Sequence, residues 1–162
     1  MIKALLFATL AVSAIAQDAA PAKFYKLDFV VREVEGGHVL NARQYSTVVI
    51  TGEKTPTAVI QTGSKVPFQS SPSSIQYADV GVNIDCDRVL EQGSDLSLSV
   101  SADISSVPES ISGSITAAPV VRQNKWRSNV LVPIRKPSVV FTADDTSSRR
   151  QMQLEVTATP MR

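Results

Sequence analysis

Residues 77–107, YADVGVNIDCDRVLEQGSDLSLSVSADISSV, decide the fold. In the first half, every second residue is apolar: Ala78, Val80, Val82, Ile84 and Cys86. A turn centred on Gly93 follows, and a second alternating series begins: Leu96, Leu98, Val100, Ala102 and Ile104. Because successive side chains of a strand point to opposite faces, each series predicts a half-buried strand. The two series match in length, so they predict a long antiparallel hairpin.

The same signals recur on both sides of this hairpin. Further strands are expected at residues 25–32, 38–50, 57–62, 120–134, 139–143 and 151–158. Turns or polar connections are expected at residues 35–37, 51–54, 69–74, 105–118, 135–137 and 144–150. No segment shows a convincing helical period over ten residues. The pattern predicts an all-β fold, an antiparallel sandwich or barrel-like sheet of about seven to eight strands.

The N-terminus has the form of a secretory signal. A short basic start precedes an apolar run at residues 4–15, and small residues at Ala14 and Ala16 suit signal peptidase. The run is too short for a membrane helix, which needs ~20 apolar residues. We therefore expect a signal peptide at residues 1–16, a flexible leader at residues 17–23 and one β domain at residues 24–162. The mature chain is expected to be exported.

Composition excludes several classes of protein. The 162 residues hold 16 Lys plus Arg and 15 Asp plus Glu, a formal charge of +1. This balance argues against nucleic-acid binding, which depends on clustered positive charge. One cysteine rules out an internal disulfide framework and a Cys-rich zinc site. One histidine means that any Ser-His-Asp site would have to use His38.

The candidate catalytic and metal-binding residues each have a simpler interpretation. His38 follows a Gly-Gly turn, and the sequence contains no Gly-x-Ser-x-Gly nucleophile motif. A solvated histidine in a turn is therefore the favoured interpretation. Asp79, Asp85 and Asp87 share one strand face, where residues two apart lie ~6.6 Å from each other. A calcium cage would therefore need oxygens from other strands, and cross-strand pairing with Arg or Lys is the favoured interpretation.

Cys86 and Trp126 also favour structural roles. Cys86 belongs to the apolar series of its strand, so we expect its thiol to be buried. The two aspartates that flank it in sequence should raise the pKa of this thiol. An intermolecular disulfide is the alternative in an oxidising compartment. Trp126 lies among basic residues but is the only tryptophan, and a core or edge position is the default. No catalytic, cofactor-binding or metal-binding residue is assigned, and no enzymatic activity, cofactor or small-molecule substrate is expected.

Three blocks in order resemble the secretin domain of type II and III secretion systems and type IV pili. They are GSKVPF at residues 63–68, YADVGVNI at residues 77–84 followed by LSLSVSADISSV, and RSNVLV at residues 127–132 followed by SVVF. The resemblance covers residues 63–143. It departs from the family where Thr142-Ala143 replaces the usual Gly-Gly pair. The connection at residues 105–118 is also short for the family's gate and membrane lip. From this resemblance, the hairpin at residues 24–50 is expected in place of the family's usual N-terminal ring-building domains.

The resemblance implies an exported, non-enzymatic module of the cell envelope, in the periplasm or at the outer membrane. It would act by sheet-mediated association with itself or by docking to a secretion- or pilus-type assembly. Its expected partners are copies of itself or other envelope proteins, with no nucleic acid. The alternative from another class is a free-standing β-sandwich that binds a ligand or an adhesive target. A hydrolase is disfavoured because the nucleophile and base motifs are missing.

Overall fold

The computed structural model describes residues 21–52, 58–71, 73–107, 121–145 and 148–161. These residues form eight strands, and no helix occurs among them: β1 (Phe24–Glu35), β2 (His38–Ile50), β3 (Ala58–Ser71), β4 (Ser74–Gln92), β5 (Asp95–Ser106), β6 (Arg122–Pro133), β7 (Ser138–Asp144) and β8 (Arg150–Pro160). The predicted all-β antiparallel fold is confirmed. The expected signal peptide lies outside the described residues, as do most of the leader and of the connection at 105–118.

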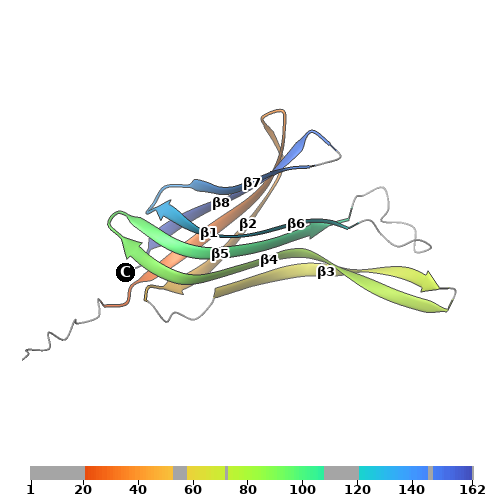
Figure 1. The fold of residues 1–162 in the computed structure, drawn as a ribbon, viewed down its shortest axis with the longest axis horizontal. Helices are drawn as coiled ribbons and strands as arrows, with labels where there is room; N and C mark the ends of the chain where they lie inside the picture. The colour runs from red at the N-terminus through yellow and green to blue at the C-terminus, as the bar shows by residue number, and fades with distance from the viewer. Residues whose placement is uncertain (1–20, 53–57, 72, 108–120, 146–147, 162) are drawn as a thin grey trace, which may run out of the picture.

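The strands form two four-stranded antiparallel sheets (Figure 1). The first, sheet A, has the order β2-β1-β8-β7, and the second, sheet B, has the order β3-β4-β5-β6. Sheet B contains the hairpin predicted from residues 77–107, with Val82 opposite Ile104 and Cys86 opposite Val100. Sheet A brings the first two strands beside the last two, because β1 pairs with β8 along its whole length.

The two sheets enclose one hydrophobic core. Its members alternate along the inner strands as the sequence predicts, and the most deeply buried are Leu27, Phe29, Ile84, Leu96, Leu98, Val100, Val132, Leu154 and Val156. Burying a Val, Leu or Phe side chain contributes about 1.5–3 kcal/mol. The core lies near the end where β1 begins and β8 ends, and this part is here named the packed end. From it the β1–β2 and β7–β8 hairpins diverge from the β3–β4 hairpin (Figure 1).

A polar contact joins the two sheets at the packed end. The hydroxyl of Tyr25, at the start of β1, donates a hydrogen bond to the carboxylate of Glu91, at the end of β4. The ammonium of Lys23 lies 2.7 Å from the same carboxylate. Burial, together with the bond to Glu91, raises the pKa of Tyr25 to about 12. Hydrogen bonds from Lys23 and Tyr25 lower the pKa of Glu91.

The prediction for residues 57–74 was wrong in its bounds. A short strand at 57–62 and a loop at 69–74 were expected, but β3 continues to Ser71 and β4 begins at Ser74. Residues 63–68, the block that resembles a short strand of the secretin family, lie within β3. Gly63 fits the strand because it faces Gly81 on β4, and Pro67 fits because β3 is an edge strand.

Candidate functional site

The open edges of the two sheets are the main candidate site. β2 and β7 are the edge strands of sheet A, and β3 and β6 are those of sheet B. Edge strand β2 of sheet A lies beside edge strand β3 of sheet B, and β7 lies beside β6. One side of the sandwich is therefore formed by β2 and β3, and the other by β7 and β6. An edge strand presents unpaired backbone N–H and C=O groups, which can pair with another chain. Among the residues that the structure describes, the molecule therefore has two open sides, each formed by two edge strands.

Each edge strand carries an exposed apolar side chain on the outer face of its sheet. These side chains are 49–55% exposed: Val48 on β2, Val139 on β7, Val59 on β3 and Leu131 on β6. The residue opposite each of them on the adjacent inner strand is polar: Lys26, Glu155, Asp85 and Ser97 respectively. Apolar exposure on the outer faces is thus found at these edge positions, where a neighbouring strand would cover it.

Beyond the body of sheet B, β3 and β4 continue as a two-stranded ribbon. β5 pairs with β4 only from Val82 onward, so residues 64–71 and 74–80, here named the distal ribbon, project alone (Figure 1). The ribbon carries exposed Ile75 and Tyr77, 63% and 61% accessible. Its only ion pair among the described residues joins Lys65 to Asp79 at 2.9 Å. The segment between those two charges is uncharged.

A pair of glycines marks the point where the ribbon leaves the sheet. Gly63 and Gly81 face each other, and Gly81 has φ +154°, a conformation that favours glycine. A Cβ on Gly81 would lie 2.1 Å from the Thr62 carbonyl oxygen, and one on Gly63 would lie 2.4 Å from the Val80 carbonyl oxygen. The Gly81 amide donates a 3.0 Å hydrogen bond to the Ser105 hydroxyl. This close approach is set by the pairing register, which sequence reasoning did not provide.

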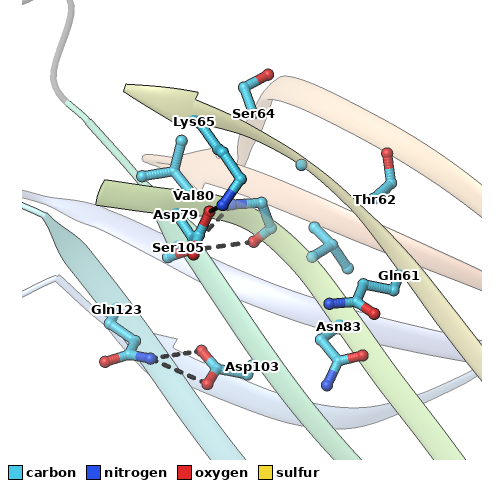
Figure 2. Close-up of a pocket in the computed structure, with 13 residues that line it drawn as sticks. Gln61, Thr62, Ser64, Lys65, Asp79, Val80, Asn83, Asp103, Ser105 and Gln123 are labelled. Atoms are coloured by element: carbon cyan, nitrogen blue, oxygen red, sulfur yellow. Dashed lines mark hydrogen bonds and ion pairs between the residues drawn. The ribbon is translucent and has the colours of Figure 1, made fainter. Parts of the chain in front are cut away.

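A polar hollow of about 560 Å³ lies on the outer face of sheet B beside the glycine pair (Figure 2). Many of its polar side chains are paired with one another. Gln123 donates two hydrogen bonds to Asp103, at 2.8 and 2.9 Å, and Lys65 pairs with Asp79. No aromatic side chain is among the described residues that line it. The hollow thus has neither the stacking platform of a sugar site nor a cluster of free ligands.

The structure places the other candidate residues apart. His38 is exposed at the β1–β2 turn. Asp79, Asp85 and Asp87 lie on the outer face of β4, and no group of three metal-ligating side chains occurs among the described residues. Cys86 is 1% exposed, and burial, reinforced by the charge of Asp87, raises the pKa of its thiol to about 12. Trp126 packs against Phe141 with ring centroids 5.4 Å apart.

No helix in the part of the chain that the structure describes is long and apolar enough to cross a membrane. No protein-family model matches the sequence, and no curated protein matches it.

Solved structures do show a similar fold. The secretin InvG of the Salmonella SPI-1 type III secretion injectisome aligns with 87% of this chain at a TM-score of 0.51 and 10% identity. InvG in the Salmonella basal-body structure with PrgH and PrgK gives the same coverage, score and identity. The type II secretin GspD of E. coli K12 covers 87% of this chain at 12% identity, with a TM-score of 0.47.

This chain spans only part of each of these proteins: 64% and 45% of the two InvG chains and 48% of GspD. The two-sheet fold of this chain is similar to that of the secretin InvG.

Proposed function

We propose that this chain is an exported, non-enzymatic, secretin-like module of the cell envelope that joins copies of itself edge to edge. Copies of the chain would associate either with one another alone or as part of a larger secretion- or pilus-type assembly. The observation that carries the proposal is the pair of open sides, β2 with β3 and β7 with β6, on a fold similar to that of a secretin. Its location would be the periplasm or the outer membrane.

Strand direction is consistent with head-to-tail joining. β1 is antiparallel to both β2 and β8, and β8 is antiparallel to β7, so β2 and β7 run in opposite directions. The same reasoning makes β3 opposite to β6. A second copy could therefore place its β7 beside β2 and its β6 beside β3, with antiparallel pairing in both sheets. Such heterologous contacts give rings if the rotation closes, and filaments if it does not.

The exposed edge side chains support the same arrangement. In a head-to-tail contact, Val48 and Val139 would come to the same face of sheet A, and Val59 and Leu131 to the same face of sheet B. Covering exposed apolar side chains at the boundary would favour the contact. Pairing would also satisfy the open backbone groups of all four edge strands.

Covalent capture tests the proposal. Replacing Cys86 with Ala removes the only cysteine of the chain. Gln44→Cys on β2 and Thr142→Cys on β7 then place single thiols on the outer face of sheet A, at exposed positions on opposite edges. A flexible bis-maleimide should join the two single-cysteine proteins into dimers when they are mixed, and should convert the double variant into a ladder.

Each single-cysteine protein alone is the matched control and should give no dimer. Dimers from one of them alone would indicate like-with-like joining of edges and would contradict the head-to-tail arrangement. Light scattering on the uncrosslinked full chain, with and without detergent, provides the independent measurement. A mass equal to one chain across the micromolar range would refute self-association.

A further inference from the structure

The side of the sandwich formed by β2 and β3 leaves part of the hydrophobic core open. Tyr45 on β2 lies opposite Phe29 on β1, and Ile60 on β3 lies opposite Ile84 on β4. Phe29 and Ile84 are almost fully buried, so Tyr45 and Ile60 face the space between the sheets. Both pack against the core but are only partly buried. Tyr45 and Ile60 are here named the β2–β3 seam.

The opposite side, formed by β6 and β7, has a corresponding pair of aromatic side chains. Trp126 on β6 lies opposite buried Ala102, and Phe141 on β7 lies opposite buried Leu154. Their ring centroids are 5.4 Å apart, so the pair joins the edge strand of one sheet to that of the other. Both rings are only partly buried. Trp126 and Phe141 are here named the β6–β7 seam.

The inward-facing residues beside both seams are uncharged toward the packed end. Many monomeric sheet proteins protect their edges with charged side chains that point inward. The next inward-facing residue on each edge strand in that direction is instead Thr47, Ala58, Ser128 or Ser138. On β2 the nearest inward-facing charge, Arg43, lies on the other side of Tyr45. The seams therefore offer apolar contact area without a charge that opposes a neighbour.

The two seams cannot contact each other within one chain. β2 and β7 are the outer strands of a four-stranded sheet, and so are β3 and β6. Their backbones therefore lie about three strand spacings apart, or ~14 Å. Fully buried side chains of the inner strands, such as Phe29 and Leu98, fill the space between them. A contact between the β2–β3 seam and the β6–β7 seam can only join two molecules.

A second copy has the geometry that each seam requires. An occupant must present two edge strands at once, at the spacing of the two sheets, and the opposite side of the same sandwich presents such a pair in the directions needed for antiparallel pairing. In sheet B, a single row crosses all four strands on the inner face: Ile60, Ile84, Ala102 and Trp126. A β6 strand that joins β3 would extend this inner face and bring its Trp126 to the side of Ile60.

We propose that Trp126 and Phe141 of one copy pack against Tyr45 and Ile60 of the next, so that the hydrophobic core continues across the boundary. The inference rests on the proposed self-association and names its apolar anchors. Trp126 is the main anchor, because buried tryptophans are enriched among the residues that dominate binding energy at interfaces. The contact covers the partly exposed faces of both seams at once.

Fluorescence of the unmodified chain tests the contact without any substitution in the core. Trp126 is the only tryptophan of the chain, so its emission reports on the β6–β7 seam directly. Light scattering identifies the concentrations at which the chain is a single copy and those at which it is assembled. Assembly should shift the emission to shorter wavelength and lower its quenching by acrylamide, because the indole loses contact with water. Identical emission and quenching in both states would overturn the inference.

Blocking one seam at a time tests which surfaces meet. Ile60→Asp and Trp126→Asp should each lower the apparent association constant at least ~10-fold. In an equimolar mixture, the intact β6–β7 seam of the first variant and the intact β2–β3 seam of the second should form dimers that grow no further. Both variants add the same charge, so charge pairing cannot explain this recovery. Dimers of either variant alone would indicate like-with-like joining and contradict the inference.

Controls separate the contact from folding and from general charge effects. Thr159→Asp, exposed on inner strand β8, adds the same charge away from both seams and should assemble like the parent. If an Asp variant fails to fold by circular dichroism, Ala at the same position replaces it, with the same direction of effect expected. Assembly of both seam variants at the parental level would overturn the inference and leave self-association intact. A parent chain that never assembles would instead refute the proposed function.

Discussion

The packed end and the distal ribbon use the same antiparallel pairing, but a second sheet covers only the packed end. At the packed end, alternate side chains of β1, β4, β5 and β8 are almost fully buried. On the distal ribbon, no side chain is buried, and Ile75 and Tyr77 are more than half exposed. Two strands without further packing are marginal in water. The comparison teaches that stability resides in the packed end, which leaves the ribbon and the edges available for contacts.

The largest expected effect tests where stability resides. Phe29→Ala, in a fully buried position of β1, should lower the free energy of unfolding by about 3–5 kcal/mol because it leaves a cavity between the sheets. Phe68→Ala on the distal ribbon should cost no more than about 1 kcal/mol. Urea unfolding followed by circular dichroism measures both. Equal losses would show that the ribbon is part of the cooperative core.

The glycine pair at the boundary comes next. Gly81→Ala should cost about 3 kcal/mol, because the new Cβ collides with the Thr62 carbonyl oxygen and φ is unfavourable for alanine. Gly36→Ala is the matched control: φ is +57° but nothing lies within 4 Å of the added Cβ, so about 1 kcal/mol is expected. Urea unfolding gives the totals, and amide hydrogen exchange locates the change. Similar losses for both variants would contradict a steric role for the close approach.

Alkaline pH should weaken the packed end through Cys86. Burial raises the pKa of its thiol from 9.0 to about 12, so the folded state holds the proton more tightly than the unfolded state. The resulting stabilisation is fully present below pH 9 and is lost as the pH rises toward 12. Between pH 8 and pH 10.5 this amounts to about 2 kcal/mol. Urea titrations should show a flatter alkaline profile for Cys86→Ala, and parallel profiles would exclude this contribution.

The smallest expected effect concerns the polar contact between the sheets. Tyr25→Phe should cost about 1 kcal/mol, because it removes the hydrogen bond to Glu91 and keeps the ring in the core. The pKa of Glu91 is lowered in the fold, so its contribution is present above the unfolded pKa of 4.5 and is lost as the pH falls. The variant should therefore differ most from the parent near neutral pH. A constant difference down to pH 3 would show that the lost energy comes from packing.

The sequence was informative where alternation was strict. Residues 77–107 predicted the β4–β5 hairpin, and the series from Val82 to Cys86 and from Leu96 to Ile104 was correctly expected on a buried face, because a two-residue period assigns side chains to faces without further information. It failed at residues 69–74, where polar composition predicted a loop but β3 continues to Ser71 and β4 begins at Ser74. Cross-strand pairing decides how far such polar residues stay extended, and local composition does not report that pairing.

The amino-acid sequence by itself determined the all-β class, the position of most strands and which residues of each strand face the core. Only the tertiary structure decided that β1 pairs with β8, that β2 and β3 share one open side, and that Gly63 faces Gly81 in sheet B. The physical reason is the separation in sequence between the residues that interact. Alternation is a property of one strand, whereas strand order depends on pairing between strands, and in sheet A the deciding pair, β1 with β8, joins segments more than a hundred residues apart.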